Sequence, residues 1–170
     1  MPSLENLHEL FVEEIRDLYD AELQLSEALP LMAKAATSSQ LKKGFTAHKK
    51  ETEEHVHRLE KIFDGLGIPP AGKICRAMRG LIAETREVIN EDTDPEVLDA
   101  ALIVAAQKIE HYEIAGYGSM RAFARLLNYK DAIRILESTL KEEVATDEKL
   151  TQLSEQLNPK AEAADLAERD

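Results

Sequence analysis

The 170-residue chain is poor in the residues that build disulfide frameworks, β-sheets and membrane spans. Cys75 is the single cysteine, so no internal disulfide can form and a cysteine-rich metal site is excluded. Aromatic residues make up only 5%, glycine occurs 7 times, and β-branched residues rarely form runs. No stretch approaches the roughly 18 apolar residues that a membrane-spanning helix needs. We therefore expect a helical protein that does not enter a membrane.

The charge balance excludes further classes of partner. The chain has 33 acidic and 21 basic residues, a formal net charge of −12, which repels phosphate backbones and anionic lipid surfaces. Binding to nucleic acid is not expected. The acidic surface could draw cations towards a buried site, although acidic surfaces commonly serve solubility alone. The first residues lack a basic region followed by an apolar run, so we expect a cytoplasmic location.

Alanine, leucine, glutamate and lysine dominate the sequence, which favours helix almost throughout. Ser3 is expected to cap the first helix with Glu5 in its first turn, and Pro30 to bend or end that helix. Asn158-Pro159 is expected to stop the last helix. The helices are expected from after Ser3 to the turn at 37–39, and then over about 40–64, 74–90, 95–127 and 130–157.

The order of these elements predicts the fold class. The long helices form two antiparallel hairpins with tight turns near residues 37 and 128, and the helix at 74–90 lies in the connection between them. A long crossover of this kind distinguishes ferritin-like four-helix bundles from simple up-down bundles. We therefore predict an all-α protein, with a ferritin-like bundle over residues 1–158 and a polar tail over 159–170.

Ionisable residues interrupt the apolar stripe of every long helix. A charged side chain that faces the core of a bundle must be paired, neutralised or bound to a metal. The interruptions are Glu22 on the first long helix, His48, Glu51 and His55 on the second, Glu110 and Glu113 on the third, and Glu143 and Asp147 on the fourth. Six carboxylates and two imidazoles are thus predicted to converge on one interior.

Counting from the tight turns predicts the height of each residue in the bundle, because residues equidistant from a turn lie level on antiparallel helices. Glu22 lies 15 residues before the first turn and Glu51 lies 14 after it. Glu113 and Glu143 lie 15 residues before and after the second turn. The four glutamates are therefore expected in one layer, with His48, His55, Glu110 and Asp147 about one turn away.

This arrangement predicts a carboxylate-bridged site for two metal ions. One glutamate on each of two helices, with a glutamate and a second ligand on the other two, is typical of di-iron and di-manganese bundles. A single glutamate on a helical stripe usually reaches solvent, but four at one level cannot all do so. A polar seam or a salt-bridge network is the alternative. We expect two iron ions per chain, or alternatively manganese, with Glu22, Glu51, Glu113 and Glu143 as the inner ligands.

Several segments resemble the bacterial YciF-type ferritin-like family. The most specific is AALIVAAQKIEHYEIAGYG at 100–118, and YDAELQL at 19–25, HKKET at 48–52 and EEVATD at 142–147 also match. The resemblance covers about residues 4–157. It implies a ferritin-like fold, a homodimer, metal in the bundle and an association with general stress responses, without an established reaction. The family typically has glutamine where this chain has His55, which leaves open whether His55 is a ligand.

Two functions are compatible with these residues. In the first, the site reacts with iron, dioxygen or peroxide during stress, in a ferroxidase-like or peroxidase-like manner. In the second, the metal is a structural staple in a stress-induced dimer that binds another protein. The surplus of carboxylates favours the first, since extra ligands permit changes of coordination. Gly116 and Gly118, both mid-helix, indicate close approach of another backbone and agree with a homodimer.

Overall fold

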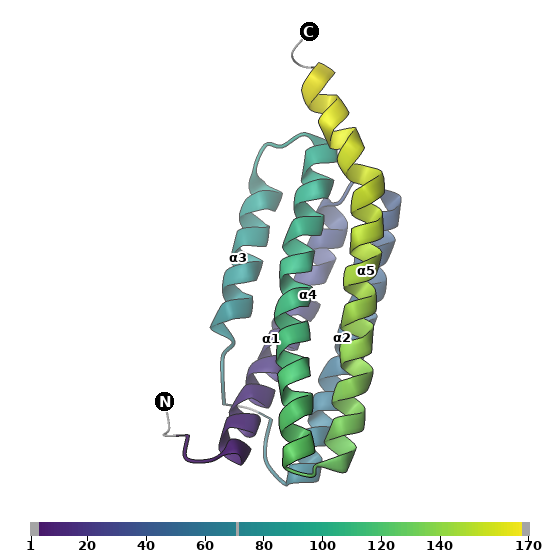
Figure 1. The fold of residues 1–170 in the computed structure, drawn as a ribbon. Helices are drawn as coiled ribbons and strands as arrows, with labels where there is room; N and C mark the ends of the chain where they lie inside the picture. Colours follow the sequence, from purple (N-terminus) through teal and green to yellow (C-terminus); the bar gives the residue numbers. More distant parts are fainter. Residues whose placement is uncertain (1–3, 71, 168–170) are drawn as a thin grey trace.

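The computed structural model describes residues 4–70 and 72–167, and these residues form five α-helices and no β-strand. The helices are α1 (Leu7–Ala35), α2 (Ser39–Leu66), α3 (Arg76–Asn90), α4 (Pro95–Leu126) and α5 (Lys130–Ala167). Figure 1 shows them side by side along one long axis. The predicted all-α class is therefore confirmed. None of the helices in the described part of the chain combines the length and the apolarity that crossing a membrane requires.

Two hairpins account for most of the packing between helices. α1 packs along α2, and α4 packs along α5. α3 lies in the connection between the hairpins and contacts both α1 and α4. Contacts of α1 with α4 and of α2 with α5 join the two hairpins. The four long helices therefore surround a shared interior, and α3 covers the outside of α1 and α4.

Local capping residues set the start of α4 and the end of α2. Asp94 caps α4 with Pro95 at its first position, and Gly67 ends α2 in the left-handed conformation at φ 67°. The predicted start of α1 is wrong, because the helix begins at Leu7. Its cap is Asn6, whose side-chain oxygen accepts a hydrogen bond from the backbone N–H of Glu9 at 2.9 Å. Ser3 lies outside the described residues.

The predicted helix stop at Asn158-Pro159 is also wrong, since α5 continues through Pro159 to Ala167. α1 likewise continues through Pro30 to Ala35. A proline within a helix removes one backbone hydrogen bond. Both prolines lie on exposed faces, where solvent can bind the carbonyl that loses its partner, and the preceding Leu29 and the nearby Leu157 are buried in the core. Packing therefore sustains the helix where local preference would end it.

The apolar core consists of two clusters. The first packs the C-terminal half of α1 and the N-terminal part of α2 against α3, the N-terminal half of α4 and the C-terminal part of α5. The second packs the opposite ends of the four long helices. Buried polar residues lie between the clusters on α2, α4 and α5, and Glu22 adds a carboxylate from α1. The core is therefore divided by a polar layer.

A buried carboxylate on α4 holds the turn between α1 and α2. Asp99 is 3% exposed and accepts hydrogen bonds from the backbone N–H groups of Thr37 and Ser38, both at 2.7 Å. The Thr37 hydroxyl donates to the same carboxylate at 2.6 Å. Hydrogen bonds to a charged group are stronger than neutral ones. Asp99 thereby joins the two hairpins at one end of the protein and sets their relative height.

Gly116 lies where α4 approaches α1 closely. A Cβ atom at this position would lie 2.7 Å from Cδ2 of Leu18, whereas Gly118 has nothing within 4 Å of the corresponding point. The close approach at Gly116 thus occurs within one chain and does not require a second copy. The expectation of a homodimer then depends on Gly118 and on the family resemblance.

Candidate metal centre

Six of the eight predicted ligand candidates come together in two buried groups. His48, Glu110, Glu113 and Glu143 form the first group, and Glu22, His55 and Glu143 form the second. Within each group, one nitrogen or oxygen atom per residue lies within 4.8 Å of the corresponding atoms of the others. Glu143 belongs to both groups. The polar layer therefore contains two adjacent sets of potential ligand atoms that share one carboxylate.

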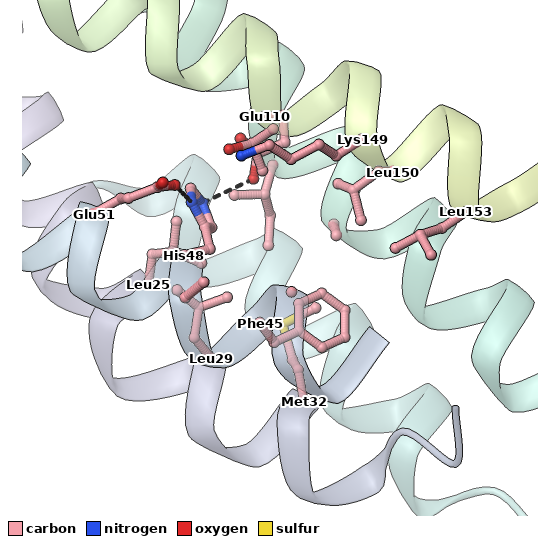
Figure 2. Close-up of a pocket in the computed structure, with 15 residues that line it drawn as sticks. Leu25, Leu29, Met32, Phe45, His48, Glu51, Glu110, Lys149, Leu150 and Leu153 are labelled. Carbon is pink, nitrogen blue, oxygen red and sulfur yellow. Dashed lines mark hydrogen bonds and ion pairs between the residues drawn. The ribbon is translucent and has the colours of Figure 1, made fainter. Parts of the chain in front are cut away.

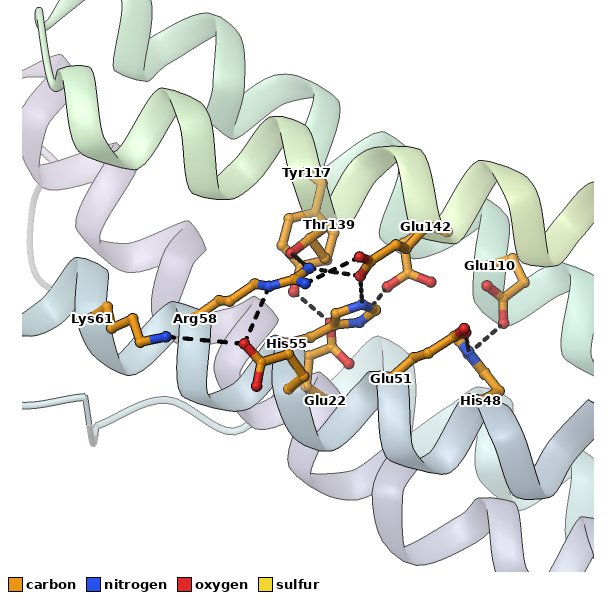
Figure 3. Close-up of polar contacts among 12 residues, drawn as sticks. Glu22, His48, Glu51, His55, Arg58, Lys61, Glu110, Tyr117, Thr139 and Glu142 are labelled. Carbon is orange, nitrogen blue, oxygen red and sulfur yellow. Dashed lines mark hydrogen bonds and ion pairs between the residues drawn. The ribbon is translucent and has the colours of Figure 1, made fainter.

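The first group lies between α2 and α4, with Glu143 added from α5. The Nε2 atom of His48 lies 3.1 Å from Oε1 of Glu110 (Figure 3). Glu113, nearly one turn further along α4, is fully buried, and neither of its carboxylate oxygens has a hydrogen-bond partner. His48 is 4% exposed and Glu110 is 1% exposed. These side chains are effectively removed from bulk solvent.

The second group is formed by α1, α2 and α5. The Nδ1 atom of His55 lies 2.9 Å from Oε1 of Glu143 and 3.2 Å from Oε1 of Glu22. All three side chains are fully buried. The hydroxyl of Tyr117 on α4 donates a hydrogen bond to Glu22. Helices distant in the sequence thus present an imidazole and two carboxylates to one point.

The inward-facing atoms lie close together without being hydrogen-bonded to one another. His48 Nε2 and His55 Nδ1 are near carboxylate oxygens, but their alignment does not meet that of a hydrogen bond. The oxygens without a hydrogen-bond partner are Oε2 of Glu22, Oε2 of Glu110 and both oxygens of Glu113 and of Glu143. Each buried polar atom left unpaired costs about 1–3 kcal/mol. Lone pairs that converge without mutual hydrogen bonds fit the coordination of a cation.

Burial and neighbouring charges shift the pKa values of these groups. Burial raises the pKa of Glu110 to about 8, and burial together with the charges of Glu22 and Glu143 raises the pKa of Glu113 well above its ordinary value. Burial would lower the pKa of His48, but the adjacent Glu110 carboxylate outweighs it and the pKa rises to about 10. The layer therefore retains protons near neutral pH unless another positive charge replaces them.

The donor set suits hard transition-metal ions. Glu22, Glu110, Glu113 and Glu143 carry four negative charges when ionised, and two divalent cations would balance them. Carboxylates with a few imidazoles are preferred by iron and manganese, whereas zinc and copper sites commonly use more nitrogen or sulfur ligands. The residues present therefore fit two such ions, and Glu143 is the side chain able to contact both.

Glu51 and Asp147 do not join the buried groups. At about 100° per residue, His55 lies only about 20° around α2 from His48, whereas Glu51 lies about 60° away on the side facing solvent. The Glu51 side chain is 37% exposed, with one oxygen 3.5 Å from Nδ1 of His48. Asp147 is 21% exposed and accepts from Gln107 and His111, each at 3.1 Å. Of the four glutamates predicted to lie in one layer, Glu22, Glu113 and Glu143 are in the buried groups and Glu51 is not.

Two residues outside the predicted ligand set, Glu142 and Arg58, hold the outer nitrogen of His55. The Nε2 atom of His55 lies 2.8 Å from Oε2 of Glu142, and Arg58 donates two hydrogen bonds to the same carboxylate at 2.6 Å and 3.0 Å. In Figure 3, dashed lines join the Glu142 carboxylate to both Arg58 and His55. Arg58 follows His55 by three residues on α2, and Glu142 directly precedes Glu143. Those spacings were available in the sequence, but neither residue lies on an apolar stripe.

Comparisons with known proteins agree with this architecture. Residues 6–163 match the family model described as Domain of unknown function (DUF892). The chain is 41% identical over 162 residues to Protein YciF of Escherichia coli (strain K12), covering 94% of this chain and 98% of that protein. The crystal structure of the E. coli stress protein YciF superposes with a TM-score of 0.89 at 40% identity, over 92% of this chain and 99% of that one. The YcfI protein of Rhodopseudomonas palustris has a TM-score of 0.85 at 41% identity, over 88% and 96% of the two chains.

Proposed function

We propose that this chain, which belongs to the family described as Domain of unknown function (DUF892), is a ferritin-like four-helix protein that binds two iron or manganese ions in its core. The observation that carries the proposal is the pair of buried groups that share Glu143, a side chain with no hydrogen-bond partner for either of its carboxylate oxygens. A buried cluster of four carboxylates and two imidazoles without a cation is costly, through desolvation and mutual repulsion. Two metal ions would remove that cost.

Each group would hold one ion. His48, Glu110 and Glu113 would bind the first ion, Glu22 and His55 the second, and Glu143 would lie between them. Tyr117, hydrogen-bonded to Glu22, would orient that carboxylate. Glu51, half exposed beside His48, would provide a carboxylate at the solvent side of the first ion.

We propose that the centre has a redox role. A centre that held two ferrous ions would have the two electrons that, with two protons, reduce one dioxygen to hydrogen peroxide or one hydrogen peroxide to two waters. The protein residues keep the centre dry and supply oxygen ligands, which suit the ferric state. The raised pKa values of Glu110 and Glu113 allow the layer to release protons as metal binds. This is a ferroxidase-like or peroxidase-like activity.

The biological setting that we propose comes from the relatives. The E. coli relative is described as a stress protein, so we propose that this chain also acts under stress. We also propose a homodimer, which is what the family resemblance in the sequence implies. The R. palustris relative is described as a candidate structural protein. That description favours the second candidate function, in which the metal only staples the helices of a protein that binds another protein. The two functions differ in whether the bound metal changes oxidation state.

The test is anaerobic titration with ferrous iron followed by addition of dioxygen or peroxide. The redox function predicts saturation at two ions per chain, a ferric absorption band and consumption of oxidant. Metal analysis of the protein as purified should find iron or manganese. A protein that binds two ions and unfolds at a higher temperature with them, but yields no ferric band with either oxidant, would have the stapling function. Absence of saturable binding would refute both.

A further inference from the structure

An apolar cavity leads from the protein surface to the first group of ligand candidates. Its volume is about 80 Å³. Side chains from α1, α2, α4 and α5 form its walls, among them Leu25, Leu29, Phe45 and Leu150 (Figure 2). Gly44 and Ala47 are exposed residues that also line it, so the cavity opens between α2 and α5.

The buried residues His48 and Glu110 also line one end of this cavity. Two charged residues border the same end on its solvent side, Glu51, whose side chain is 37% exposed, and the exposed Lys149. The remaining walls are almost entirely hydrocarbon, and Met32 and Leu153 extend them away from the ligand candidates. A molecule within the cavity would therefore contact aliphatic and aromatic groups until it reached His48.

We propose that this cavity is the binding and entry site for dioxygen at the metal centre. The inference rests on the proposed redox function and specifies its oxidant. Peroxide or a hydrated ion would lose hydrogen bonds to water on entering the cavity, and the apolar walls offer few hydrogen bonds in replacement. Dioxygen is uncharged and apolar, so it loses almost no hydrogen bonds on entering. An apolar cavity of about 150 Å³ holds benzene or xenon in another protein, so a volume near half of that suits a diatomic gas better than an organic substrate.

Gly44 allows the cavity to be closed without altering a proposed ligand. A Cβ atom at Gly44 would have nothing within 4 Å, so a larger side chain can be accommodated at the mouth. Gly44 lies within α2, where replacement of glycine by a better helix former also removes an entropic cost. Gly44→Leu places a branched side chain at the mouth. Gly44→Ala is the matched control, because it changes the helix preference but leaves the mouth open.

Xenon binding tests the cavity independently of any reaction. Crystals of the metal-free protein under xenon pressure should show xenon between Phe45 and His48 in the parent and in Gly44→Ala, and less of it in Gly44→Leu.

Stopped-flow oxidation of the ferrous-loaded protein tests whether dioxygen reaches the metal through this cavity. Gly44→Leu should slow oxidation by dioxygen about tenfold, equivalent to about 1.4 kcal/mol, and leave oxidation by peroxide unchanged.

The outcomes separate this inference from the proposed function. Absence of xenon from the parent cavity, or equal slowing of both oxidants in Gly44→Leu, overturns the cavity as a dioxygen site while iron binding stands. Unchanged dioxygen kinetics in a Gly44→Leu protein that no longer binds xenon overturns it as well. Failure of the parent to bind ferrous iron removes the proposed centre, and this inference with it.

Discussion

The outer nitrogen of His55 lies 2.8 Å from a carboxylate oxygen of Glu142, and this contact turns the other nitrogen towards the interior. With the Glu142 carboxylate on α5 accepting from Nε2, the other nitrogen, Nδ1, faces Glu143 and Glu22. Burial would lower the pKa of His55, but these two carboxylates outweigh it and raise the pKa to about 11, so Nδ1 also carries a proton in the metal-free protein. Carboxylate partners of this kind orient metal-binding histidines in many proteins and raise their basicity. Glu142 therefore orients His55 so that Nδ1 can bind a metal ion that displaces its proton.

Removal of the Glu142 carboxylate should weaken metal binding without removing a ligand. We expect Glu142→Ala to lower the affinity for the second ion by about 10- to 100-fold, because the His55 ring loses its orientation. Glu142→Gln should lose less metal affinity than Glu142→Ala, since the amide oxygen of glutamine can still accept a hydrogen bond from Nε2 of His55. Competitive titration with a chelator measures both. Glu148→Ala, an exposed change on the same helix, is the control, and an equal loss in that variant would refute the positioning role.

Substitutions of Glu143 and of Glu51 should have very different effects on metal binding, although sequence spacing places both residues in one layer. Glu143 is fully buried and belongs to both ligand groups, whereas the Glu51 side chain is 37% exposed. Glu143→Gln should abolish binding of both ions, and Glu51→Gln should leave two ions per chain with weaker affinity. Metal analysis after gel filtration measures the stoichiometry. Full loading of Glu143→Gln would contradict the assignment of a shared ligand.

The metal-free protein should become less stable as the pH rises from about 5.5 to 8.5. Burial raises the pKa of Glu110 in the folded state to about 8 from an ordinary value of 4.5. The neighbouring carboxylate raises that of His48 to about 10 from 6.5, against the effect of burial. Both groups thus hold protons in the folded state that the unfolded chain releases, and stability falls with pH wherever the folded state binds more protons.

Urea unfolding of the chelated protein at several pH values measures this slope. The stabilising contribution of His48 is complete below pH 6.5 and is lost towards pH 10, and the cost of ionising Glu110 appears between pH 4.5 and 8. Glu110→Gln should flatten the dependence, because the amide does not titrate. With excess manganese the slope should reverse, since metal displaces the protons more readily at higher pH. A flat profile in the chelated parent would show that the layer does not hold these protons.

Alanine at Gly116 and at Gly118 should have opposite effects on stability. The new Cβ at residue 116 would lie 2.7 Å from Cδ2 of the buried Leu18, so Gly116→Ala should destabilise by about 1–3 kcal/mol through overpacking. Gly118 has open space around it, and Gly118→Ala should stabilise by about 0.5–1 kcal/mol through helix preference. Chemical denaturation measures both. Concentration-dependent destabilisation by Gly118→Ala would instead place residue 118 in a contact between two copies.

The helices and the height of the polar layer follow from the sequence because they depend on local chemistry. Apolar residues recur with the helical period, and glycine or capping residues such as Gly67 and Asp94 act through their own backbone and their nearest neighbours. Residue counts from the two turns brought Glu22, Glu113 and Glu143 to one level, since the helical rise is nearly constant. The same counts also gave Glu51 that level.

Only the tertiary structure decided which side chains at that level face inward. The rotation of α2 about its own axis depends on how it packs against α1 and α5, and this rotation turns His48 and His55 into the core and Glu51 towards solvent. Packing likewise carries α5 through Pro159 and brings Glu142 against His55. These outcomes depend on contacts between residues far apart in the chain, such as positions 55 and 142, whose free energies the local sequence does not contain.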